Sequence, residues 1–234
     1  MRFYKFFISI FLIFTMCFYI TTPVFSEETT YVWSPNNNSL NDSTNDNSSQ
    51  VKETNSEVDE SNSLSLESGS AILIEQTTGQ VLYSHNAHEQ LRPASVTKVM
   101  SILLIMEALD SNKISLTDSV PCSENAASMG GSQIWLDPRE TLTVDEMLKA
   151  ICVNSANDCV VAMSEFIAGS EEAFVQLMND KAKELGMNDT CFKNCHGLDE
   201  DGHVTSAYDI SLMSRELLVN HPTITNDTLR NRKI

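Results

Sequence analysis

Hydrophobic positions divide the chain into three regions. An apolar run covers residues 6–20, and the stretch 27–67 is then dominated by Asn, Ser, Thr and Glu. Beyond it, apolar residues recur with the periods of strands and helices, and the last residues, 226–234, are polar again. This pattern predicts an N-terminal targeting segment over 1–26, a disordered linker over 27–67 and one folded domain over 68–234.

Within the domain, the pattern predicts one hairpin followed mainly by helices. Two runs of β-branched and apolar residues, 70–76 and 80–84, flank Thr77-Thr78-Gly79 as strands flank a turn. Pro93 suits the first position of a helix that stays apolar on most sides as far as Leu109. Strands beside a helical block indicate an α+β fold or an α/β sandwich, with the far strands of the sheet absent here. Caps and apolar stripes predict further helices over 143–152, 160–168 and 170–185 and from Ser206 onward.

Ser95 and Lys98 are the strongest candidates for chemistry. They lie one turn apart at the start of the predicted helix, so the amine of Lys98 can approach the hydroxyl of Ser95. A buried lysine loses its proton more easily and can then activate a serine, which is otherwise a weak nucleophile. The same spacing occurs at Ser49 and Lys52, in the polar stretch that buries nothing. The alternative is an ordinary buried serine beside a lysine that extends to solvent.

Ser155-Ala156-Asn157 is the second candidate segment. It joins the predicted helix that opens with the Thr143–Glu146 capping box to the predicted helix that ends at Gly169. A short polar link between two buried helices presents a hydroxyl and an amide at a corner of the fold, where binding groups concentrate. The alternative is that Ser155 only caps the second helix.

Taken together, these residues resemble the serine D-alanyl-D-alanine carboxypeptidases, the low-molecular-mass penicillin-binding proteins. The resemblance covers residues 69–220, and the matching segments keep the order and spacing of the family. These segments are 70–75 with Thr78-Gly79, 92–98, Gly131-Ser132 with Pro138, 142–144, 153–158, 196–199 and 205–209.

The resemblance implies an α+β fold of the β-lactamase and D,D-peptidase type, and a serine-type hydrolase that needs neither cofactor nor metal. It implies that Ser95 is the acylated nucleophile, Lys98 its general base and Ser155 a proton relay. Asn157 is implied to hold the substrate amide. The implied substrate is a peptidoglycan pentapeptide ending in D-Ala-D-Ala, and β-lactam antibiotics are implied to trap the acyl-enzyme. The implied role is in peptidoglycan biosynthesis and cell shape.

The third motif of the family, Lys-Thr-Gly, has no counterpart after Ser155. In the family, that strand supplies the lysine that receives the terminal carboxylate of the substrate and a second oxyanion donor. We therefore expect a partial catalytic domain, truncated before Lys-Thr-Gly and lacking the C-terminal strands of the sheet. Two other functions stay open. One is a non-catalytic wall-associated remnant, and the other is a β-lactamase, for which we find no Glu-x-x-Leu-Asn segment.

The N-terminus and the net charge bear on localisation and partners. Arg2 and Lys5 precede the apolar run, which is short for a membrane span, and small residues lead to Ser26. We expect a signal peptide cleaved after Ser26, with an uncleaved membrane anchor as the alternative. The protein is then bacterial and extracytoplasmic, at the wall or secreted, and meets the membrane only through an uncleaved N-terminus or a missing C-terminal segment. A formal net charge of −17 argues against nucleic acid as a partner.

The cysteines do not form a disulfide framework. The chain has 6 cysteines, and an odd number remains once Cys17 of the apolar run is set aside. Cys191 and Cys195 are the pair that we consider for a disulfide in an oxidising compartment. A metal site that also uses His196 and His203 lacks the usual ligand spacing.

Overall fold

The computed structural model describes residues 66–226. The predicted signal peptide over 1–26, nearly all of the predicted linker over 27–67, and the polar tail beyond residue 226 lie outside the described residues.

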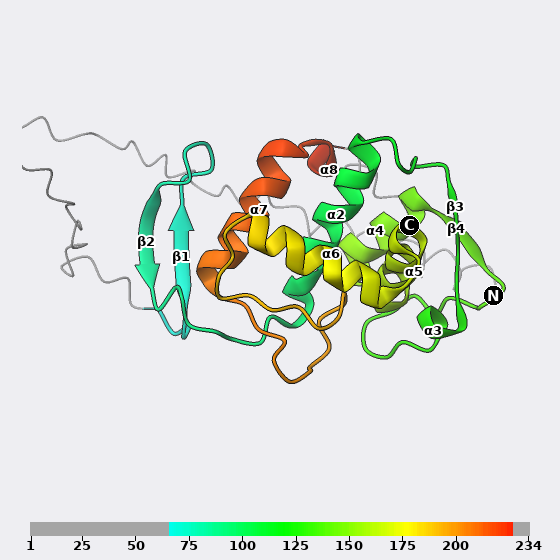
Figure 1. The fold of residues 1–234 in the computed structure, drawn as a ribbon, viewed down its shortest axis with the longest axis horizontal. Helices are drawn as coiled ribbons and strands as arrows, with labels where there is room; N and C mark the ends of the chain where they lie inside the picture. The colour runs from blue at the N-terminus through cyan, green and yellow to red at the C-terminus, as the bar shows by residue number, and fades with distance from the viewer. Residues whose placement is uncertain (1–65, 227–234) are drawn as a thin grey trace, which may run out of the picture. The chain divides into compact units, whose positions relative to one another are not determined.

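Helix α2, Lys98–Asp110, is the centre of the fold, and α5, α6 and α7 pack against it (Figure 1). It is buried along almost its whole length, as its apolar residues predict for a helix surrounded on most sides. The packing helices are α5, Asn157–Ala168, α6, Glu171–Glu184, and α7, Ala207–Asn220. Methionines fill much of the space between them, since their flexible thioethers fit irregular gaps. The largest fully buried side chains include Phe174, Phe192, Met100, Leu103, Ile105, Met147, Met163, Met178 and Met213.

The predicted hairpin is confirmed. Strands β1, Ala71–Ile74, and β2, Val81–His85, pair antiparallel, and β1 lies against α7. The guanidinium of Arg215 on α7 fastens the turn, because Nε donates to Gln76 O at 2.8 Å and Nη2 donates to Thr77 O at 2.7 Å. The hairpin is therefore attached to the helical block through backbone carbonyls.

The helices that follow begin and end close to where their capping residues predict. Helix α4, Val144–Asn154, opens with the predicted capping box: Glu146 N donates to Thr143 Oγ1 at 3.2 Å, and Thr143 N donates to Glu146 Oε2 at 2.8 Å. The hydroxyl of Ser170 caps α6, and the hydroxyl of Ser206 caps α7. Helix α5 starts at Asn157 itself and ends at Gly169, which is left-handed at φ 87°.

Several short elements were not predicted. Strands β3, Ser119–Pro121, and β4, Thr141–Thr143, pair antiparallel. Helices α3, Glu124–Ala127, and α8, Thr223–Asn226, add one turn each. Three or four residues are too few to show a hydrophobic period, so only contacts distant in sequence define these elements. Among residues 66–226, no helix combines the length and the apolar character that a membrane span requires.

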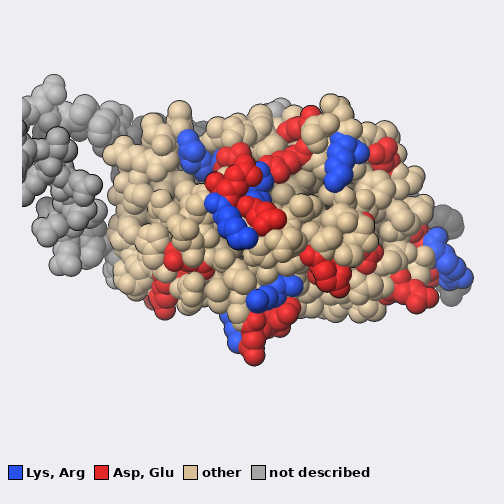
Figure 2. All heavy atoms as spheres, in the orientation of Figure 1, with Lys and Arg blue, Asp and Glu red and all other residues tan. Residues whose placement is uncertain are grey.

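Acidic and basic side chains are mixed on the face that α6 forms (Figure 2). Lys181 Nζ lies 2.8 Å from Glu107 Oε1 on α2 and 2.7 Å from Glu184 Oε2. Lys181 is half-buried in these contacts, so this ion pair links α6 to α2 beside the apolar core.

Candidate active site

Ser95 and Lys98 are brought together as predicted. Lys98 is the first residue of α2, and its Nζ lies 3.2 Å from Ser95 Oγ. The preceding turn, Ala94–Thr97, is a 3₁₀ helix, whereas we predicted one continuous helix from Pro93. Ala94 adopts a left-handed backbone at φ 45°, which accounts for this difference. The turn leaves Ser95 exposed while Lys98 is only 3% exposed.

Burial prepares Lys98 to act as a base. Its Nζ donates a second hydrogen bond, to His196 O at 2.7 Å, and reaches Ser95 from inside the protein. Removal from water disfavours the ammonium and lowers the pKa of Lys98 from 10.5 to about 8. At pH 7, roughly a tenth of the lysine is then free amine, against less than a thousandth for an exposed lysine. Lys98 is therefore not the lysine that extends to solvent in the alternative interpretation.

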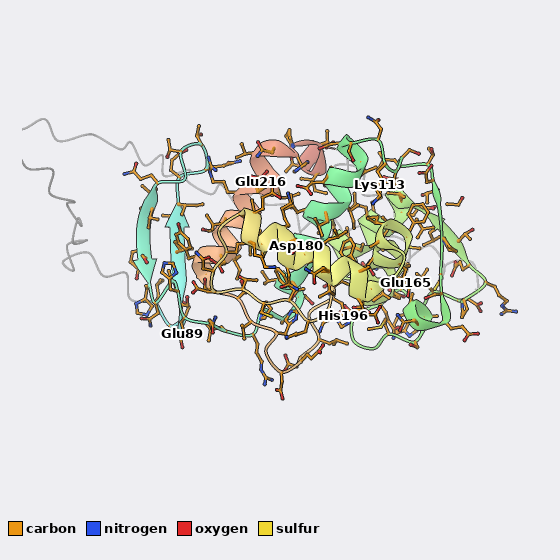
Figure 3. The ribbon with its side chains drawn as sticks, viewed as in Figure 1. Glu89, Lys113, Glu165, Asp180, His196 and Glu216 are labelled. Atoms are coloured by element: carbon orange, nitrogen blue, oxygen red, sulfur yellow. The ribbon has the colours of Figure 1, made fainter. Side chains whose placement is uncertain are left out.

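The segment 194–203, here called the backing loop, packs against the Ser95 turn. Ser101 Oγ donates to Cys195 O at 2.7 Å, so two successive carbonyls of the loop, at Cys195 and His196, bind α2. Gly197 contacts the carbonyl of Ala94 so closely that a Cβ at residue 197 would overlap that oxygen. Figure 3 labels His196 on this loop at the lower edge of the helical block.

Polar side chains stiffen the backing loop from within. Asn194 Oδ1 accepts from Gly197 N at 2.7 Å, and Asn194 Nδ2 donates to Leu198 O at 3.0 Å. His203 Nδ1 accepts from Lys193 N at 3.0 Å, so the neutral ring carries its proton on Nε2, which lies 2.8 Å from Thr97 Oγ1. Sequence reasoning considered His203 only for a metal site and gave Asn194 no role, although the family resemblance already contained 196–199.

The Ser155-Ala156-Asn157 segment forms the corner between α4 and α5. Ser155 is half-buried in a left-handed backbone at φ 55°, and Asn157 is only 3% exposed. Asn157 Nδ2 donates to Gly130 O at 2.7 Å, and its backbone N donates to Ser132 O at 2.7 Å. Within the described residues, Asn157 Oδ1 is buried without a hydrogen-bond partner. The side-chain oxygen of Asn157 can therefore still accept a hydrogen bond from another group.

The backing loop connects this corner with the Ser95 turn. A Cβ at Gly131 would lie 2.8 Å from Asn157 Nδ2 and 3.4 Å from Leu198 Cδ2, so Gly131 lies between the corner and the loop. No hydrogen bond in the described part of the chain joins the Ser155 hydroxyl to Ser95 or to Lys98. The proton-relay role of Ser155 therefore stays a prediction.

Asp158, which sequence reasoning missed, fixes the segment beside this corner. Its carboxylate accepts from Ile134 N at 3.1 Å and from Leu136 N at 3.1 Å. The backbone of Trp135, between those two donors, is left-handed at φ 59° and its side chain is 78% exposed. A buried aspartate at the start of a helix was the only local signal for this role.

Comparisons with known proteins show the family of this chain. The profile of the peptidase S11 family, described as D-alanyl-D-alanine carboxypeptidase, matches residues 53–232. The chain belongs to this family. It is 61% identical over 155 residues to the D-alanyl-D-alanine carboxypeptidase DacF of Bacillus subtilis, covering 66% of this chain and 40% of that protein. It is 37% identical over 164 residues to DacC of Escherichia coli, covering 68% of this chain and 41% of that protein.

Solved structures confirm the predicted α+β fold of the penicillin-binding proteins. The D-alanyl-D-alanine carboxypeptidase DacD from Francisella tularensis matches with a TM-score of 0.67 and 33% identity, over 68% of this chain and 38% of that one. Penicillin-binding protein D2 from Listeria monocytogenes, in its ampicillin-bound form, matches with a TM-score of 0.62 and 28% identity, over 70% and 67%. The chain spans about two fifths of the length of the curated relatives it matches.

The cysteine pair that we considered is not a disulfide in this structure. Cys191 and Cys195 are both free thiols. Cys195 is fully buried, and its thiol lies 3.3 Å from Glu171 Oε1. In the described part of the chain, no cluster of three or more His, Cys, Asp or Glu side chains is arranged to hold a metal ion.

Proposed function

We propose that Ser95 attacks the carbonyl carbon between the two terminal D-alanines of a peptidoglycan pentapeptide. The Ser95 hydroxyl gives its proton to Lys98 Nζ as the bond from Oγ to the carbonyl carbon forms. The C–N bond then breaks, and the leaving D-alanine takes the proton from the Lys98 ammonium. Water hydrolyses the resulting serine ester and regenerates the Ser95 hydroxyl. A β-lactam is opened by the same attack, since its strained amide occupies the position of the peptide bond.

The observation that carries this proposal is the contact between a buried lysine and an exposed serine. Lys98 Nζ lies 3.2 Å from Ser95 Oγ, and burial lowers the pKa of Lys98 to about 8. The pair therefore combines an accessible nucleophile with a base that is partly unprotonated near neutral pH. A serine and a lysine without a chemical role would not require the ammonium to be withdrawn from water.

The Ser155–Asn157 corner supports the binding half of the proposal. We propose that Asn157 Oδ1 accepts a hydrogen bond from the amide N–H of the substrate. This oxygen is a buried acceptor that has no partner in the described residues. Ser155 is assigned the relay of protons to the leaving group. Localisation outside the bacterial plasma membrane, after removal of residues 1–26, belongs to the same proposal. It is supported by the charged and apolar N-terminus.

Fluorescent penicillin labelling of the full chain tests the proposal. We expect a stable adduct that Ser95→Ala abolishes and that Ser49→Ala leaves unchanged, because Ser49 has the same spacing to a lysine but lies in the polar stretch. Release of D-alanine from a pentapeptide should follow the same pattern. A folded chain that neither labels nor releases D-alanine is the non-catalytic wall-associated remnant. Rapid turnover of penicillin without a stable adduct indicates a β-lactamase.

A further inference from the structure

Glu171, the first residue of α6, contacts the backing loop through its carboxylate. Its Oε1 accepts from Cys195 N at 3.3 Å and from Cys195 Sγ at 3.3 Å, and it lies 3.4 Å from His196 Nε2. The side chain is only 19% exposed. Burial raises the pKa of the Cys195 thiol, which therefore stays protonated and acts as a donor. One carboxylate oxygen thus meets both residues that precede Gly197.

Cys195 and His196 also bind helix α2, which begins with Lys98. The carbonyl of Cys195 accepts from Ser101 Oγ at 2.7 Å, and the carbonyl of His196 accepts from Lys98 Nζ at 2.7 Å. The backbone N–H and the thiol of Cys195 and the ring of His196 contact Glu171, whereas the carbonyls of the same two residues contact α2.

The imidazole of His196 lies beside the Glu171 carboxylate. Its Nδ1 accepts from Leu198 N at 3.1 Å, so the neutral ring carries its proton on Nε2, the atom that faces Glu171. Burial lowers the pKa of His196, the charge of Lys98 lowers it further, and the carboxylates of Glu171 and Glu200 oppose both effects. The ring is therefore neutral at pH 7 and does not compensate the charge of the Glu171 carboxylate.

We propose that Glu171 is the positioning residue of the Ser95–Lys98 pair: its carboxylate fixes the Cys195–His196 segment and is the counter-charge for the Lys98 ammonium. The second part rests on the proposed function, since the ammonium forms on Lys98 when it takes the proton of Ser95. A negative charge behind the base stabilises the protonated lysine, which keeps it a stronger base than burial alone would allow.

Titration of Lys98 by NMR of its side chain tests this proposal directly. We expect Glu171→Gln to lower the midpoint of the Lys98 titration by about half a pH unit, because the ammonium loses a nearby negative charge. The matched control is Glu172→Gln, which removes an equal charge from the next, exposed position of α6. Glu171→Asp, which keeps the charge, should stay closer to the wild-type midpoint. Equal midpoints in wild type, Glu171→Gln and Glu172→Gln would overturn the proposal.

The titration needs no acylation, which separates this proposal from the proposed function. If penicillin labels the chain, the acidic limb of the rate profile should move to lower pH in Glu171→Gln and the plateau should fall roughly threefold, since the base is weaker. A shifted Lys98 midpoint in a chain that penicillin does not label refutes the proposed function and supports Glu171. Labelling with an unshifted midpoint refutes Glu171 alone.

A measurement on the wild-type chain covers the case in which Glu171→Gln does not fold. The His196 ring lies against Glu171 and its carbonyl holds Lys98, so its resonances should show an inflection at the pH where Lys98 titrates. A His196 titration without that inflection contradicts an electrostatic connection across the loop and refutes the proposal.

Discussion

At the scale of single residues, Lys98 combines two properties that rarely occur together. Its side chain is almost completely buried, yet both hydrogen bonds of its Nζ end on oxygens, Ser95 Oγ and His196 O. Neither acceptor carries a full charge, so neither offsets the loss of water as a bound carboxylate would. The lowered pKa of Lys98 follows from that difference, and it is the property that the proposed chemistry uses.

The first prediction concerns pH. The rate of penicillin acylation should rise with pH through a midpoint of about 8, because only unprotonated Lys98 accepts the Ser95 proton. Below this midpoint the ammonium predominates and the rate should fall about tenfold for each pH unit. The measurement is the second-order labelling rate between pH 6 and 10, with circular dichroism as a control for folding. A rate that is flat or that decreases over this range contradicts the assignment of Lys98.

The second prediction concerns Gly197. Replacement by Ala places a Cβ on the carbonyl of Ala94 and moves the Ser95 turn, so acylation should fall at least tenfold, as small displacements in active sites do. The matched control is Gly169→Ala, which has a similar φ, 87° against 91°, and nothing within 4 Å of the added Cβ. Gly169→Ala should lose about 1 kcal/mol of stability from backbone strain alone, whereas Gly197→Ala should lose more because of the overlap, and only Gly197→Ala should lose labelling. Equal labelling rates in the two variants would contradict the role of this contact.

The sequence was sufficient for residues whose role depends on neighbours in the chain. Ser95 and Lys98 are three residues apart, and helical geometry alone predicts their contact. The left-handed Ala94, which contacts Gly197, and the Asp158 contacts with Ile134 and Leu136 depend on segments that lie far away in sequence. No local pattern encodes such contacts, which is why they could not be predicted.

At the scale of elements, the longer helices could be predicted because the capping residues and the hydrophobic period indicate the same helix ends. The Thr143–Glu146 capping box, the Ser170 and Ser206 caps and the end at Gly169 are each present. The first turn before α2 is the exception: a 3₁₀ helix replaces the expected α-helical start, and Ser95 on this turn is exposed. Elements of three or four residues escaped prediction because contacts with other segments define them.

The third prediction concerns the attachment of the hairpin to α7. Arg215→Ala removes two hydrogen bonds to the carbonyls of Gln76 and Thr77, so it should lower the free energy of unfolding by about 1–2 kcal/mol. The matched control is Arg139→Ala, whose side chain is 90% exposed and pairs only with Asp137, and it should change stability by less than about 0.5 kcal/mol. Urea unfolding followed by circular dichroism measures both values. Similar losses in the two variants would refute the attachment.

At the scale of the whole molecule, the chain contains the proposed nucleophile, the proposed base and the Ser-Ala-Asn corner in one helical block. It spans about two fifths of the length of the curated relatives it matches. The two small sheets of the described part lie at the margins of that block (Figure 1). The two groups to which we assign the proton transfer, Ser95 and Lys98, therefore lie within this block.

The fourth prediction concerns the N-terminus of the mature protein. If residues 1–26 are a signal peptide, the protein recovered from the outside of bacterial cells should begin at Glu27. N-terminal sequencing of the recovered protein measures this. A protein that keeps Met1 and fractionates with membranes would show instead an uncleaved anchor. A protein that keeps Met1 and stays in the cytoplasm would contradict the localisation.

The most direct test of the account is the mass-spectrometric location of the penicilloyl group on the intact, folded chain. We predict one added group, located on the peptide that contains Ser95, and a rate of addition that follows the deprotonation of Lys98. An adduct on any other residue, or one that persists in Ser95→Ala, would contradict the central claim that a buried amine activates this serine.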